Sequence, residues 1–245
     1  MRARAVVPTL AALALAATAV SLGNWQLRRA DEKRALQAQR DAADRDAAVQ
    51  VAPGDLDAAT LDGRRVVARG RLRAERTVFV DNRTHKGIAG FHVLSPLRIT
   101  GSDRHVLILR GWIARDPRDR TRLPDLRTPS GEVEIEGLAQ RDLERVLELG
   151  RSPPPGPQDR LWQNADVATF AQWSGLAMQP LVVRQTVAPR EGGADRDDGL
   201  VRQWPDPGSG VDKHLGYAFQ WYALAVLVAG LWIRFVLFRT GKAGK

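Results

Sequence analysis

The sequence predicts an α+β protein: an antiparallel, β-rich domain with a few helices, flanked by one transmembrane helix at each end. Two observations support this fold class. Charge-free apolar runs occupy residues 5–22 and 215–233 of the 245-residue chain, and a helix of about 20 apolar residues crosses the hydrocarbon of a bilayer. Between these runs, short segments rich in β-branched and aromatic residues follow one another without the long helical patterns that βαβ units require.

The first apolar run predicts an uncleaved signal anchor. Arg2 and Arg4 precede it, and Trp25 follows it where an interfacial aromatic residue belongs. The run is longer than the apolar region of a typical cleaved signal peptide, although Ala17-Thr18-Ala19 offers a cleavage site. We therefore divide the chain into an N-terminal transmembrane helix (1–23), an extracytoplasmic domain (24–213), a C-terminal transmembrane helix (214–238) and a basic tail (239–245).

Two spans place both chain ends on the same side of the membrane. Basic residues near these ends favour the cytoplasm: Arg2, Arg4, Arg239, Lys242 and Lys245. Basic residues also follow the first span, but long domains are translocated largely regardless of charge. The prediction is a two-pass protein with cytoplasmic termini and a domain on the outer side.

The elements of the domain are predicted in order along the chain. The stretch from Trp25 to Val49 is rich in helix formers and free of glycine and proline, so the first span should continue as a helix that ends before Pro53-Gly54. Strands are predicted over residues 65–72, 77–80, 90–97, 105–114, 131–139 and 181–187. Turns are expected at Asn82-Arg83 with Lys86-Gly87, and at residues 101–103.

The second half of the domain contains one predicted helix and two loops. The proline-rich residues 150–157 predict a stiff extended loop. Asn164 is the expected cap of a helix that begins at Ala165 and ends at Gly175. Residues 191–198 are polar and predict a loop. The domain tryptophans at 112, 162, 173 and 204 are expected to pack in the core.

Composition and motifs exclude several functions. The net charge is +9, but basic and acidic residues are interspersed and no nucleic-acid-binding motif occurs, so nucleic acid is not expected as a partner. The absence of cysteine excludes disulfides and thiolate chemistry. No hydrolase elbow, phosphate loop or zinc-protease motif is present. The hairpin places His92 and His105 on adjacent strands, where a two-histidine metal site is conceivable but ordinary strand residues are expected.

A polar cluster opens the second apolar run. On a helix, His214, Tyr217, Ala218 and Trp221 share one face. One interpretation is an aromatic belt at the lipid boundary. The other is that a neutral imidazole ligates haem iron, with Gly216 and Ala218 leaving room for the macrocycle. Spacing alone favours the belt.

Five stretches in order resemble the Surfeit-locus family of cytochrome c oxidase assembly factors: LGNWQLRRADEKRAL, DNRTHKGIAGFHVLSPL, VLILRGWI, GRSPPPGPQDRLWQNADVATFAQWSGL and DGLVRQWPDPGSGVDKHLGYAFQWYALA. The resemblance implies a bacterial member, with two uncleaved spans in the cytoplasmic membrane and a periplasmic domain. It implies a non-enzymatic factor that binds haem a and assists its insertion into oxidase subunit I. The implied partners are subunit I, the haem a synthesis machinery and the lipid bilayer.

The resemblance also implies a site. His214 matches the histidine that binds the haem a iron in bacterial members. Tyr217 and Trp221, which share its helix face, are the other predicted cofactor-binding residues. Arg202 or Lys213 could pair with the haem propionates. The alternative is a scaffold that stabilises a subunit I intermediate by protein contact without carrying haem.

Overall fold

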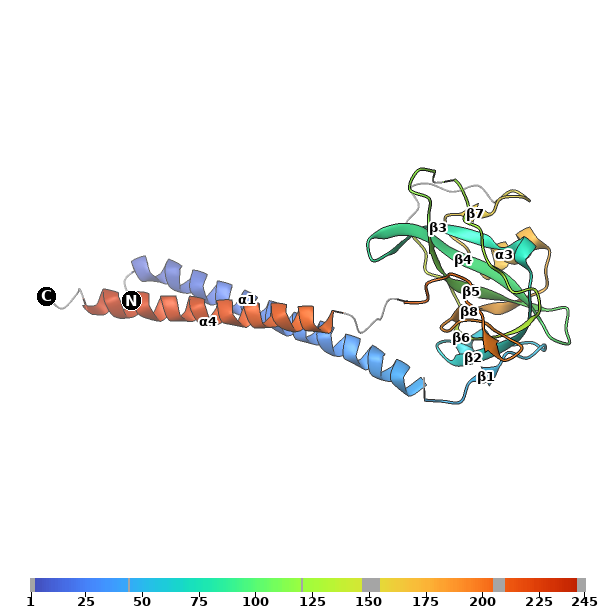
Figure 1. Cartoon of the computed structure of the whole chain (residues 1–245). Coiled ribbons are helices and arrows are strands. Elements are labelled where there is room, and N and C mark those ends of the chain that lie inside the picture. Colours follow the sequence, from blue (N-terminus) through green and yellow to red (C-terminus); the bar gives the residue numbers. More distant parts are fainter. Residues whose placement is uncertain (1–2, 44, 120, 147–154, 205–209, 242–245) are drawn as a thin grey trace. The chain divides into compact units, whose positions relative to one another are not determined.

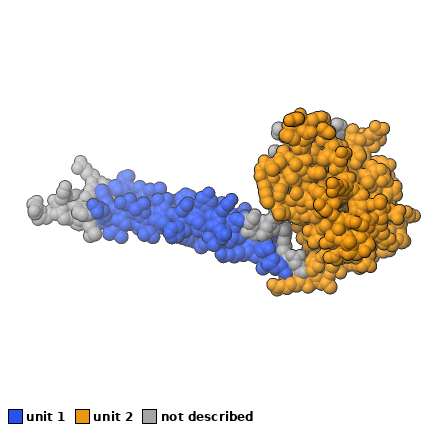
Figure 2. All heavy atoms as spheres, in the orientation of Figure 1, with its two compact units in different colours: residues 1–41, 205–245 blue, residues 42–204 orange. Residues whose placement is uncertain are grey.

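The structure is a computed structural model that describes residues 3–43, 45–119, 121–146, 155–204 and 210–241. The chain forms two compact units, which Figure 2 shows in different colours. One unit comprises residues 1–41 and 205–245, and the other residues 42–204. The first is a helix pair, and the second contains the β-structure.

The helix pair consists of α1 (Ala3–Ala43) and α4 (Val211–Gly241), which lie side by side and antiparallel (Figure 1). Both helices are long and apolar enough to cross a membrane, which agrees with the two predicted spans. The prediction that the first helix continues to Val49 is wrong. The helix ends at Ala43, and β1 (Val49–Gln50) pairs with a strand of the domain instead.

The seam between the helices has a heptad pattern. The residues that α1 turns inward are spaced alternately three and four apart: Thr9, Ala12, Ala16, Ala19, Gly23, Gln26 and Ala30. The matching residues of α4 are His214, Ala218, Trp221, Ala225, Val228 and Trp232. This spacing is typical of a left-handed coiled pair. The small residues allow the two backbones to approach closely, as in membrane helix pairs.

The second unit is built on a closed barrel. Its strands are, in order around the ring, β2 (Arg65–Leu72), β4 (Ile88–Ile99), β5 (His105–Ala114), β8 (Met178–Gln185) and β6 (Glu132–Gln140). β6 pairs back with β2 and closes the barrel (Figure 1). The predicted α+β, β-rich class is confirmed. The sheet is mixed, however, since β8 runs parallel to β5.

The mixed pairing follows from the place at which β8 joins the barrel. β5 and β6 run in opposite directions, since β5 is antiparallel to β4, β4 to β2 and β2 to β6. β8 lies between them, so it must run parallel to one of the two. The connection from β6 contains α3 (Val167–Ser174), which packs against β8, and β8 begins at the end of the barrel where β6 ends, antiparallel to β6 and parallel to β5.

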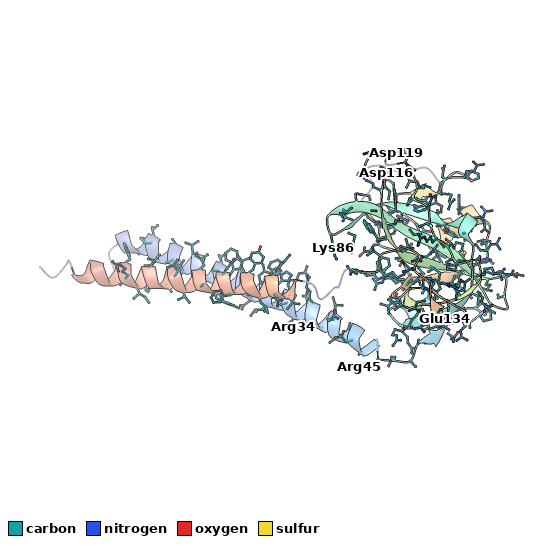
Figure 3. The ribbon with its side chains drawn as sticks, in the orientation of Figure 1. Arg34, Arg45, Lys86, Asp116, Asp119 and Glu134 are labelled. Carbon is teal, nitrogen blue, oxygen red and sulfur yellow. The ribbon has the colours of Figure 1, made fainter. Side chains whose placement is uncertain are left out.

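Shorter elements decorate the barrel. β3 (Val78–His85) forms a hairpin with β4, and the turn lies at Lys86-Gly87, as predicted (Figure 3). Asn82-Arg83 is not a turn but a bulge within β3, where Asn82 has a φ of 59°. The remaining elements are α2 (Ala58–Leu61), η1 (Ala74–Arg76), β7 (Leu161–Trp162), β9 (Arg190–Glu191) and β10 (Ala194–Asp195). β9 and β10 form a small hairpin where the sequence predicts a loop.

The start of α3 differs from the prediction. Asp166, not Asn164, caps the helix, and its carboxylate accepts a hydrogen bond from the backbone N–H of Thr169. Asn164 instead bonds both the N–H and the carbonyl of Val146. The predicted end at Gly175 is confirmed, with a φ of 70°. The proline-rich loop lies largely outside the described residues.

The core and the tryptophans agree with the prediction. Aliphatic residues of β2, β4, β5, β6 and β8 fill the barrel interior. A second cluster lies outside the barrel, where Trp162 and Phe170 are buried and Trp173 and Trp204 pack against them. Trp112 is 7% exposed and donates a hydrogen bond to the carbonyl of Arg83. These tryptophans are packing residues.

A buried ionic cluster continues the barrel interior. Arg110 lies on the same face of β5 as the core residue Ile108, and its side chain is fully buried. Its guanidinium donates to Asp198 at 3.1 Å and to Thr128 at 2.8 Å. Arg202 donates to the same carboxylate oxygen of Asp198 at 2.6 Å. The cluster therefore ties the segment after β10 to the barrel.

Candidate functional site

The two domain histidines considered for a metal site lie far apart. The β4–β5 ladder pairs His92 with Trp112 and pairs His105 with Arg98, which is six residues further along β4. At about 3.3 Å per residue, the two side chains are about 20 Å apart. Within the described ranges, no three histidine, cysteine or acidic side chains gather as metal ligands. The conceivable two-histidine site therefore does not form.

His92 makes the stability of the domain depend on pH. Burial, with Arg83 and Arg184 nearby, lowers its pKa from 6.5 to about 4. The neutral ring is thus favoured in the folded state, so this stability is present above pH 6.5 and is lost as the pH falls toward 4. We expect the free energy of unfolding to fall by about 3 kcal/mol across this window. Urea unfolding at about pH 7 and about pH 4.5 measures this change in the free energy of unfolding. The change should be smaller in His92→Gln than in wild type. An unchanged difference would contradict the assignment.

His214 lies in the seam between α1 and α4. Its Nδ1 is 2.7 Å from Oε1 of Gln26, and Gln26 is 9% exposed. An amide oxygen can only accept a hydrogen bond, so the neutral ring must donate from Nδ1. The lone pair of a histidine in this tautomer resides on Nε2. His214 is therefore a held imidazole with one nitrogen available to a ligand.

The other two predicted site residues, Tyr217 and Trp221, differ in how far they are buried. Trp221 is partly buried on the seam, whereas Tyr217 is 53% exposed. Ala218 is 2% exposed and packs within the seam, so the expectation that it leaves room for a macrocycle is wrong. Gly216 does face open space, but two residues along a helix do not face each other, so this space lies away from His214. The exposed neighbour of His214 on its own face of α4 is Tyr217.

The sequence analysis assigned no role in the site to four residues of α1 and α4: Gly23, Asn24, Gln26 and Tyr222. Gln26 holds His214, and the hydroxyl of Tyr222 donates to Asn24. The ring of Tyr222 also lies against Gly23, where a Cβ would come within 2.9 Å of it. A pattern in the sequence could have identified Gln26: small residues of α1 recur at alternate spacings of three and four up to Gly23. This spacing, extended by one step, points to Gln26.

A groove runs along α1 next to the seam. It has a volume of about 500 Å³ and is lined by Leu13, Ala16, Ala17, Val20, Ser21, Asn24 and Arg28. The part of the groove between Leu13 and Val20 is apolar, and its end near Asn24 and Arg28 is polar. Of the two cations proposed for haem propionates, Lys213 is exposed. Arg202 is bound to the buried Asp198 within the domain and is not available.

Comparison with known proteins identifies the family. The model of the SURF1 family matches residues 13–226, which include most of α1, the whole barrel domain and the first half of α4. The chain belongs to the SURF1 family. It is similar to SURF1-like proteins of Dictyostelium discoideum (24% identical, covering 89% of this chain and 92% of that protein) and Monosiga brevicollis (25% identical, covering 91% and 85%). A SURF1-like protein of Drosophila melanogaster is 25% identical, covering 93% and 77%.

The resemblance drawn from the sequence motifs is thus confirmed. SURF1-family proteins are non-enzymatic assembly factors of cytochrome oxidase. Two candidate membrane-spanning helices indicate that this member is a membrane protein. The bacterial origin, the division of the chain at the membrane surface and the haem-binding roles of His214, Tyr217 and Trp221 stay predictions.

Proposed function

We propose that this SURF1-family protein binds haem a at His214 and holds it for insertion into subunit I of a haem–copper oxidase. The observation that carries the proposal is the hydrogen bond from Nδ1 of His214 to Gln26, because it leaves Nε2 as a metal ligand. Haem iron accepts a neutral imidazole as an axial ligand. Haem a is the cargo, and the redox chemistry that it supplies belongs to the oxidase.

The surroundings of His214 suit a flat, partly apolar cargo. Tyr217, which lies one helical turn from His214, offers an exposed aromatic face. Exposed Lys213 can pair with a propionate. The apolar part of the groove along α1 can hold the hydrocarbon tail of haem a, since it is lined by Leu13, Val20 and small residues. A single histidine ligand suits a protein that must also release the cargo.

The position of His214 along the axis of the helix pair, just beyond the apolar zone, supports a site at the membrane surface. Trp232 bonds Thr9 at one end of the shared apolar zone, and Tyr222 contacts Gly23 at the other end. On α1 these contacts are about 21 Å apart. Gln26 and His214 lie roughly one further turn along, at the depth of the lipid headgroups. Haem could therefore exchange from there without crossing the hydrocarbon.

The test is haem binding by the full-length protein in lipid nanodiscs. We expect wild type to take up haem a with an axial-histidine spectrum. In His214→Ala the affinity should fall by more than the roughly 10–100-fold that loss of a supporting hydrogen bond costs. Phe219→Ala is the matched control, because Phe219 is a 74% exposed ring five residues further along the same helix. Equal haem affinity in His214→Ala and wild type would eliminate the site.

Co-purification with oxidase subunit I distinguishes haem transfer from scaffolding. If His214→Ala captures subunit I as well as wild type but delivers no haem a, the transfer function is supported. If neither protein binds haem a and both capture subunit I, the scaffold function replaces it. The comparison uses one substitution and two independent readouts.

We also propose that both chain ends face the cytoplasm of a bacterial cell and that the barrel domain is periplasmic. The antiparallel helices put both ends of the pair on one side, and the basic residues of the termini favour the cytoplasm. The chain has no cysteine, so single introduced cysteines report topology directly. A cysteine at Lys86 should react with an impermeant maleimide in intact spheroplasts, and one at Lys245 should not.

A further inference from the structure

We infer that Gln26 is a positioning residue that selects the metal-binding tautomer of His214 and sets the strength of its bond to iron. The inference rests on the proposed function and extends it to the opposite helix. Sequence reasoning treated α4 alone as the site, but the structure places the partner of its histidine on α1. The site is therefore a property of the helix pair.

The first step of the argument is burial. Gln26 occupies a seam position between Gly23 and Ala30, and it is 9% exposed. A buried amide without a partner is costly, so a polar residue at this position needs a specific acceptor or donor across the seam. Nδ1 of His214 lies at 2.7 Å from its oxygen and meets this need. The contact is a built feature of the seam rather than a surface encounter.

The second step is the direction of the hydrogen bond. The Gln26 oxygen accepts, so Nδ1 of the neutral ring carries the proton and Nε2 is free of it. In solution the neutral imidazole of histidine exchanges between two tautomers. Metal-bound histidines commonly have this kind of support, in which the second nitrogen donates to an oxygen that fixes the ring orientation. Gln26 thus prepares His214 for a metal before any cargo arrives.

The third step concerns ligand strength. A carboxylate acceptor draws the Nδ1 proton strongly and makes the ring a stronger ligand, whereas an amide oxygen does so moderately. An amide therefore gives a bond that holds iron and can still release it. Gln26→Glu should bind haem at least as tightly as wild type and release it more slowly. Gln26→Leu, of similar size, should bind about 10–100-fold more weakly.

The experiment first measures the tautomer without haem. Full-length protein with ¹⁵N-labelled histidine is placed in nanodiscs at a pH where the ring is neutral, and the signal of His214 is assigned by its loss in His214→Ala. Wild type should show a protonated Nδ1, and Gln26→Leu should shift the population toward a protonated Nε2. Gln220→Leu is the matched control, since Gln220 is an exposed glutamine near the site on α4. It should leave the tautomer unchanged.

The second measurement uses haem a. In the ferrous state, the iron–histidine stretching band should move to lower frequency in Gln26→Leu and to higher frequency in Gln26→Glu, which a merely structural helix contact would not cause. Unchanged tautomer, band and haem affinity in Gln26→Leu would overturn the inference while the proposed function stands. A tautomer that depends on Gln26 in a protein that binds no haem would support the positioning role and remove the proposed function.

Discussion

Replacing Asp198 with asparagine is expected to lower the free energy of unfolding of the barrel domain by about 3–5 kcal/mol. The carboxylate is 1% exposed and is shared by the guanidiniums of Arg110 and Arg202. Burial already lowers the pKa of Arg110, and Asp198 opposes that effect. Without the carboxylate, two cations stay in a low-dielectric environment with no countercharge, and this penalty exceeds the strength of either hydrogen bond alone.

The measurement is urea unfolding of the full-length protein in detergent, followed by tryptophan fluorescence. Asp197→Asn is the matched control, because Asp197 is exposed and its one hydrogen bond, from the N–H of Gly199, can be kept by asparagine. Adding Arg110→Met to Asp198→Asn should restore part of the loss, because it removes a buried unpaired charge. A loss below about 1 kcal/mol in Asp198→Asn would show that the cluster is solvated.

Gly70→Ala is expected to destabilise the barrel by about 3 kcal/mol or more. Gly70 lies where β2 pairs with both neighbouring strands, opposite Ile99 of β4 and Val133 of β6. A Cβ on residue 70 would overlap the backbone carbonyl oxygen of Arg98. That oxygen belongs to the β2–β4 ladder and cannot move aside as a flexible side chain would, so β2 must separate from β4.

Gly54→Ala provides the control for this substitution. No heavy atom lies within 4 Å of a Cβ at residue 54, so the variant should unfold at the wild-type urea concentration. Gly137 resembles Gly70 in that it pairs with two neighbouring strands, opposite Val66 of β2 and Gln185 of β8. Gly137→Ala should therefore resemble Gly70→Ala. Wild-type stability of Gly70→Ala would mean that the β2–β4 pairing is not needed for the fold.

Local patterns predicted most of the individual elements. The strands 65–72 and 105–114 were placed at their observed bounds, because β-branched residues and flanking turn residues act over a few neighbours. The end of α3 at Gly175 follows from the same short range. The cap of α3 and the bulge at Asn82 were missed, since Asn164 and Asn82 suit several local roles and contacts with distant strands decide between them.

The arrangement of these elements was not available from local patterns. Barrel closure depends on β6 pairing with β2 and on β8 entering parallel to β5. Such pairings join residues far apart in the chain, and alternation of apolar residues predicts a buried face but not its neighbour. The buried position of Arg110 is similarly non-local, because it requires Asp198, 88 residues away.

The amino-acid sequence was enough to predict the two apolar helices, the β-rich domain between them, the family resemblance and His214 as the candidate ligand. These conclusions depend on composition and on spacing within one element. The tertiary structure alone decided that His214 meets Gln26, that Ala218 is buried and that Tyr217 is exposed. The physical reason is that the side of a helix that faces its neighbour depends on the partner helix, and 188 residues separate Gln26 from His214.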